Sequence, residues 1–296
     1  MGSTRKPGTD ARLKAVRAGG PEEVLAALDD PSAVVVEAAA QRLSQPRAAG
    51  ALLRAYLRLH EGAPLSDSGC WARMAILEAL ARLEAPEGED AARLAVRSVQ
   101  VEAVGFGLSD TATGLRVAGA GLLANLRVPD ALIDLAWLLH DFVPNANCSA
   151  AEAPFAKMAA RVAAARAIGA LGDPAGAAIL GVKLAFPHAE VPDVLAECMD
   201  ALVALREPRA FEFLQPWLAS TNPYLVATAG TALAAADGLK ALPLLVSALE
   251  DAVADAREPL VYAIGSIRAD AAREALLRLA EHPDKRISKV AKELTE

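Results

Sequence analysis

Aromatic side chains are scarce in this 296-residue chain: only 4% of residues are Phe, Trp or Tyr, although 54% are hydrophobic. The core must therefore be built from Ala, Leu, Val and Ile. Chains rich in Ala and Leu favour helices, and small side chains let helices approach closely. No segment alternates between apolar and polar residues with the period of two that a half-buried strand shows. The composition therefore predicts an all-α protein.

Cysteine is also scarce, because the chain has only Cys70, Cys148 and Cys198. They are far apart and form no C-x-x-C pair, which excludes a disulfide framework and a thiolate metal site and indicates a reducing compartment. The first residues, MGSTRKPGTD, lack the apolar stretch of a signal peptide. We therefore expect a cytoplasmic protein.

The chain has neither an excess of positive charge nor an uninterrupted apolar run long enough to cross a membrane. Its net charge is −7 and no dense stripe of Lys and Arg offsets it, so nucleic acid is not an expected partner. The longest uncharged stretch, 213–236, is interrupted by Pro216, Ser220 and Asn222. It predicts a helix, a turn and a second helix, and no membrane association is expected.

Internal repetition is the strongest positive signal. In the segment 159–186, Ala160, Ala164 and Ile168 share one helical face. Gly172-Asp173-Pro174 then predicts a turn into a second helix, because Gly favours helix ends and Pro favours first turns. The same pattern of helix, short turn and helix recurs along the chain. Equivalent positions in the first helices, separated by 40, 43, 45, 34, 31 and 31 residues, are Ala40, Leu80, Leu123, Ile168, Leu202, Leu233 and Ile264.

These units resemble HEAT repeats, specifically the short bacterial kind named after phycobilin lyases. The resemblance rests on an Arg after a small or Leu residue in Ala-rich helices, on the Gly-Asp-Pro turn, and on an A-x-P-x-L pattern from Ala241 to Leu245. It covers nearly the whole chain and implies a right-handed α-α superhelix of about eight helical pairs. The Arg-containing pairs are Leu115-Arg116, Ala160-Arg161 and Ala256-Arg257.

The repeat pattern predicts one solenoid over residues 10–296, preceded by a flexible segment over 1–9. A lone charged helix at 284–296 would cap its end, because a terminal repeat needs a polar outer face. Two inserted loops are expected, at 60–70 and at 142–154. Long loops in compact folds are often functional, and the alternative is drift of the repeat.

We find no catalytic, cofactor-binding or metal-ligating set in the sequence. Each histidine is expected near the end of a second helix, where a His complements the helix dipole. HEAT-like deoxyhypusine hydroxylases bind two irons through several His-Glu pairs, and this chain has only His60-Glu61. Gly105-Phe106-Gly107 lacks the context of a phosphate loop and is expected to allow close helix packing. The histidines are His60, His140, His188 and His282.

A partner surface is expected on the second helices, which usually line the concave face of a HEAT solenoid. In the third pair, the outward face would carry an aromatic residue among acids. The next two pairs would continue it as an apolar row, and contiguous apolar surface rimmed by charge marks an interaction site. Alternatively, curvature or the 142–154 loop covers this row. The predicted partner-binding residues are Trp137, Asp130, Asp134, Asp141, Ile179, Val182, Phe186 and Phe213.

The sequence therefore predicts a monomeric, non-enzymatic scaffold that binds a protein or peptide segment in its groove. In this hypothesis, Trp137 is an anchor and the three acids receive basic residues of the partner. Trp217 is expected in the core, and Trp71 is expected to pack on the loop before its helix. The alternative is a bilin or chromophore lyase, or a cofactor chaperone, that uses the same groove.

Overall fold

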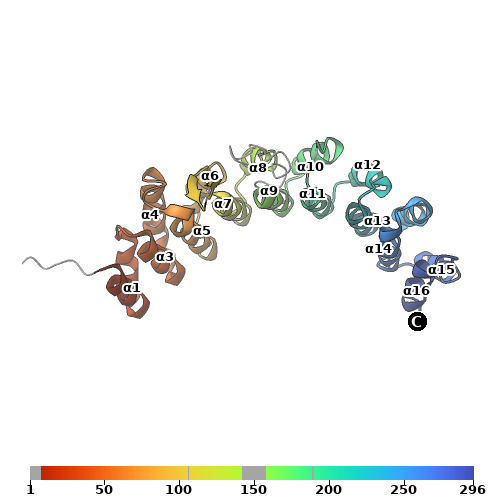
Figure 1. The fold of residues 1–296 in the computed structure, drawn as a ribbon, viewed down its shortest axis with the longest axis horizontal. Coiled ribbons are helices and arrows are strands. Elements are labelled where there is room, and N and C mark those ends of the chain that lie inside the picture. Colours follow the sequence, from red (N-terminus) through yellow and green to blue (C-terminus); the bar gives the residue numbers. More distant parts are fainter. Residues whose placement is uncertain (1–7, 106, 142–157, 189) are drawn as a thin grey trace, which may run out of the picture. The chain divides into compact units, whose positions relative to one another are not determined.

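A computed structural model describes residues 8–105, 107–141, 158–188 and 190–296 (Figure 1). Within these ranges the chain is helical except for short turns and one small hairpin. The described residues form two compact units, Met1–Ala167 and Ile168–Glu296. The predicted all-α fold is confirmed. The expected loop at 142–154 and most of the expected N-terminal segment lie outside the described residues.

The first unit begins with a helical pair, α1 (Thr9–Ala18) and α2 (Pro21–Ala26), followed by a 3-10 turn, η1 (Ala27–Asp29). Three more pairs follow, and among their first helices α1 packs on α3, α3 on α5, and α5 on α7. The first helix of the fifth pair, α9 (Met158–Leu171), includes residues of both units. The remaining elements are α3 (Ala33–Arg42), η2 (Pro46–Ala48), α4 (Ala49–Glu61), η3 (Ser68–Cys70), α5 (Trp71–Arg82), α6 (Gly88–Val96), β1 (Val101–Val104), β2 (Gly107–Asp110), α7 (Thr113–Asn125) and α8 (Ala131–Leu139).

The second unit continues the same arrangement up to a single final helix. One helix, α13 (Pro223–Asp251), is long and apolar enough to cross a membrane by length and composition. Asp237 interrupts it with φ −159° and ψ 94°, so it is a helical pair with arms 223–236 and 238–251, as the repeat pattern predicts. The other elements are α10 (Gly176–Ala185), α11 (Pro192–Ala204), α12 (Ala210–Leu214), η4 (Gln215–Ala219), α14 (Ala254–Gly265), α15 (Asp270–Leu279) and α16 (Lys285–Glu293).

The core follows the predicted register of the repeat. Helices α1 to α15 make eight pairs in the described part of the chain, counting α13 as one pair, and α16 stands alone as expected. Small residues permit the close approach of helices: a Cβ at Gly169 would lie 2.9 Å from Cβ of Ala201 in α11. All seven equivalent apolar positions are 0% exposed, namely Ala40, Leu80, Leu123, Ile168, Leu202, Leu233 and Ile264.

The turn inside four of the pairs has a common sequence and geometry. Each follows a first helix and reads Leu, a residue with positive φ, any residue, and Pro. The residue with positive φ ends the helix in the left-handed conformation, which closes a backbone bond such as Val128 N–H to Leu123 O at 3.2 Å. Pro then blocks continuation of the helix. The residues with positive φ are Glu84 (48°), Arg127 (50°), Gly172 (70°) and Arg206 (53°).

Buried arginines fix two first helices to the segments that precede them in the first unit. Arg73 pairs with Asp67 at 3.0 Å and Arg116 pairs with Asp110 at 2.8 Å, and all four side chains are at most 2% exposed. In both cases the acid stands six residues before the arginine, just upstream of the helix. Arg116, one of the residues that carry the resemblance to HEAT repeats, is therefore a structural cation.

A two-stranded hairpin corrects one sequence prediction. Gly105, expected to allow close helix packing, has φ 58° and lies in the turn between β1 and β2. The strands pair antiparallel from Val101↔Asp110 to Val104↔Gly107. Glu102 anchors the hairpin, because its carboxylate accepts hydrogen bonds from Gly69 N at 2.9 Å and from Gln100 Nε2 at 3.0 Å. The hairpin is thus attached to the 60–70 insertion.

Candidate functional site

Three of the predicted binding acids already have arginine partners. Asp134 is buried and pairs with Arg93 of α6 and with Arg97 directly after that helix, each at 2.6 Å. Asp130 pairs with Arg93, and the hydrogen bond from Arg93 lowers the pKa of its carboxyl. Asp141 lies 3.7 Å from Nε of Arg116. These carboxylates therefore make contacts within the chain, and a basic residue of a partner would have to compete with these arginines for them.

Trp137 lies on the outward face of α8, as predicted, and is 68% exposed. Ile133, one turn earlier on the same helix, is 63% exposed. The sequence analysis missed Ile133, although its spacing of four residues from Trp137 was a readable signal. Together they form an exposed apolar patch on α8, bordered by the ion pairs between α6 and α8.

The other four predicted binding residues belong to the second unit. Val182 of α10 and Phe186, directly after α10, are 54% and 61% exposed, and Ile179 of α10 is half-buried. Phe213 of α12 is half-buried and packs on α10, where a Cβ at Gly181 would lie 2.8 Å from its ring. The structure therefore brings these four residues together on two neighbouring second helices.

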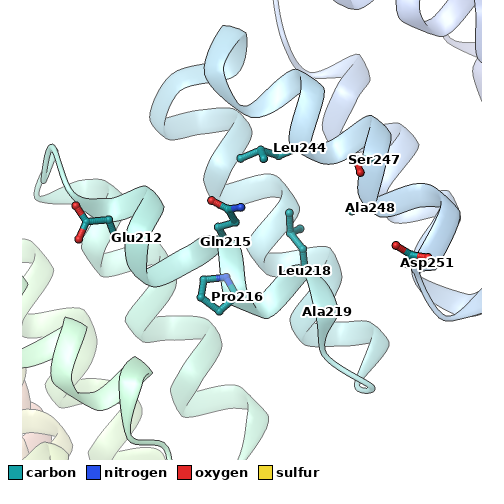
Figure 2. Close-up of a pocket in the computed structure, with 9 residues that line it drawn as sticks. All are labelled: Glu212, Gln215, Pro216, Leu218, Ala219, Leu244, Ser247, Ala248 and Asp251. Atoms are coloured by element: carbon teal, nitrogen blue, oxygen red, sulfur yellow. The ribbon is translucent and has the colours of Figure 1, made fainter.

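Two adjoining pockets run along these second helices. One lies between the end of α10 and α12–η4, has a volume of about 610 Å³, and is lined by Leu184, Pro187, Phe213, Trp217, Ser220 and Thr221. The other lies between η4 and the 238–251 arm of α13, has a volume of about 360 Å³, and is lined by Gln215, Leu218, Leu244, Ser247, Ala248 and Asp251 (Figure 2). Glu212, Pro216 and Ala219 line both pockets. We call the two pockets together the second-unit groove.

The charge in the second-unit groove is negative at one end. Glu212 and Asp251 lie at opposite ends of the smaller pocket (Figure 2). Glu212 is paired with Arg209 at 2.6 Å, whereas Asp251 forms no ion pair within the described part of the chain. No Lys, Arg or His lines either pocket. The groove therefore offers apolar surface with one unbalanced carboxylate.

Trp217 corrects a second prediction. It was expected in the core but is half-buried and lines the larger pocket of the groove. The reason is that 215–219 forms the 3-10 turn η4, which advances three residues per turn. Leu214 and Leu218, at 0% and 8% exposure, take the inner positions instead. The expectation for Trp71 is confirmed, because its ring packs on Gly69 of the preceding loop, although it is 61% exposed.

The described residues contain no group of three His, Cys, Asp or Glu side chains that could hold a metal ion. All four histidines lie at the ends of second helices, as predicted. His60 is half-buried, however: it stacks on Tyr56 with ring centroids 6.1 Å apart, and burial lowers its pKa. Burial also raises the pKa of the Cys70 thiol to about 11 and that of Cys198 to about 12, so neither is a reactive thiolate.

No protein-family profile and no curated protein matches this chain. Several solved structures are similar, among them the following three. The complex of CpcE and CpcF of phycocyanin lyase from Nostoc sp. PCC7120 is 17% identical, with a TM-score of 0.40 over 99% of this chain and 98% of that chain. Human deoxyhypusine hydroxylase in complex with glycerol is 15% identical, with a TM-score of 0.36 over 97% and 96%. An engineered protein is 17% identical, with a TM-score of 0.39 over 97% and 90%. Such scores carry nothing about function.

Proposed function

We propose that this chain is a non-enzymatic helical-repeat scaffold of the HEAT-like kind that binds a protein segment in the second-unit groove. The observation that carries the proposal is that two pockets adjoin across the second helices of three successive pairs. Their floor is apolar, with Phe213, Trp217 and Leu244 in the lining. Segment-binding repeat proteins use such extended surfaces, because neighbouring repeats each add a part of the site.

The exposed side chains around the groove support this proposal. Val182 on α10 and Phe186 directly after that helix are exposed beside the groove. A bound segment would shield the apolar surface of both side chains from water. Aromatic residues such as Phe186, Phe213 and Trp217 commonly dominate interfaces, at about 2 kcal/mol or more each on truncation. The patch of Ile133 and Trp137 on α8 would serve as a further contact for a longer partner. We propose a monomeric, cytoplasmic protein.

A bilin or chromophore lyase is the alternative, and the charge of the groove disfavours it. Bilins carry carboxylate side chains, which need cations as partners. No cation lines either pocket, and Asp251 would repel such groups. An absorption spectrum after mixing the purified protein with a bilin tests this alternative, because a bound bilin would change its spectrum.

Selection of binders from a random 16-residue peptide library tests the proposal. The full chain should enrich peptides that bind reproducibly. Phe213→Ala and Trp217→Ala should each weaken these peptides by about tenfold or more, because the truncated side chains line the larger pocket. Tyr262→Ala is the matched control, since Tyr262 is 51% exposed on α14 and lines neither pocket. Loss of binding in the control alone would contradict the proposal.

A further inference from the structure

The second-unit groove ends, at Asp251, beside a helix C-terminus that carries acids and no basic residue. The last turns of α4, α6, α10 and α15 carry a cation, which complements the negative end of the helix dipole, whereas those of α2, α8 and α12 carry none. The last turn of α13 has no basic residue and ends with Glu250 and Asp251. This arrangement is unfavourable for the free chain, because carboxylates add negative charge at a helix C-terminus.

The two ends of the smaller pocket therefore differ in charge. At the Glu212 end, Arg209 donates hydrogen bonds to both carboxylate oxygens of Glu212, so that charge is balanced within the chain. At the other end, Glu250 has only His282 nearby, at 3.9 Å, and Asp251 has no ion pair in the described part of the chain. Between the ends the groove has Leu218, Leu244 and Ala248.

We infer that the segment bound in this groove is apolar in its middle and carries Lys or Arg at one end, which lies over Asp251 and the end of α13. The inference rests on the proposed function and adds the charge and the direction of the partner. Apolar side chains of the segment fill the two pockets. Its cation meets Asp251, Glu250 and the helix end, which together offer the negative potential that the chain itself leaves unbalanced.

Defined peptides test the inference. Two peptides share the apolar sequence recovered from the library; one has a terminal Lys-Arg and the other has Gln-Gln in its place. The basic peptide should bind about three- to fivefold more tightly at low salt, and the advantage should shrink as salt is added. In Asp251→Asn the two peptides should bind more nearly alike. Asp255→Asn is the matched control, since Asp255 is exposed and pairs with Arg286 outside the groove.

The outcomes separate this inference from the proposed function. If both peptides bind equally well and still require Phe213 and Trp217, the partner is not basic and the inference is overturned while the proposed function stands. If no peptide depends on Phe213 or Trp217, both are overturned. A second readout needs no ligand, because Asp251→Lys should raise the melting temperature of the free chain. In peptide binding, the same variant should abolish the preference for the basic peptide. An unchanged preference in Asp251→Lys would also overturn the inference.

Discussion

Lys183 of α10 and Glu190, just before α11, form an ion pair of 2.6 Å in which both side chains are at most 1% exposed. Arg73 and Arg116 each stand six residues after the acid that they pair with, Asp67 and Asp110. The residue six positions after Glu190 is Ala196. The arginine of the repeat is thus missing at α11, and a lysine from the preceding second helix supplies the cation. The buried acid is retained because its cation is replaced from a neighbouring element.

The first prediction concerns this pair. Lys183→Met should destabilise the protein by about 3 kcal/mol or more, because it leaves Glu190 buried without its cation. Lys183→Met combined with Glu190→Leu should recover much of the loss, since no buried charge remains. Urea unfolding measures both. The exposed pair of Arg209 and Glu212 is the control, and Arg209→Ala should cost under about 1 kcal/mol. A double variant no better than the single one would contradict this account.

The second prediction concerns the turns that follow first helices. Arg127→Gly and Arg206→Gly should each stabilise the chain by about 0.5–1 kcal/mol, because both residues have positive φ and glycine adopts that conformation without strain. Gly172→Ala should have the opposite sign at the equivalent turn, where φ is 70°. Thermal unfolding of the three variants gives the comparison. Destabilisation by both glycine substitutions would show that side-chain contacts outweigh backbone strain.

The third prediction concerns acid stability. Burial alone would raise the pKa of Glu102, but hydrogen bonds from Gln100, Thr111, Gly69 and Ser68 lower it to about 2. A carboxyl with a lowered pKa stabilises the fold above its unfolded pKa, about 4.3, and that contribution disappears as the pH falls toward the folded value of about 2. Glu102→Gln should therefore lose stability at pH 7 and show a flatter decline between pH 4.5 and pH 2. Urea unfolding across this range checks the slope, and a decline parallel to the wild type would refute it.

The fourth prediction concerns the final helix. Ile287, Val290 and Ala291 of α16 are buried, and α16 packs on α14 and α15. Truncation before Pro283 should therefore expose apolar surface and cause aggregation or fraying, because solenoid ends need polar caps. Light scattering and a melting curve report the result. A truncated chain that stays dispersed with an unchanged melting curve would show that α16 is no cap.

The sequence predicted the fold better than the site, and particular residues show why. Periodicity identified the seven core positions from Ala40 to Ile264 because packing between repeats is local. The burial of Asp134 could not be predicted, since its partners Arg93 and Arg97 are 41 and 37 residues away. The displacement of Trp217 depends on the local change to a 3-10 turn, which helical periodicity does not anticipate. The hairpin had a signal in Gly105 and Gly107, but strands of four residues are too short for a pattern of period two.

The proposed binding surface can be located directly by tryptophan fluorescence, because the chain has only Trp71, Trp137 and Trp217. Three single-tryptophan variants, each with the other two residues changed to Phe, report separately on the loop before α5, on α8 and on the second-unit groove. On titration with a library-selected peptide, the account predicts a blue shift of emission in the variant that retains Trp217, because the half-exposed indole loses water contact. No shift is expected in the variant that retains only Trp71. Saturable binding that leaves Trp217 emission unchanged while shifting that of Trp71 would contradict the account.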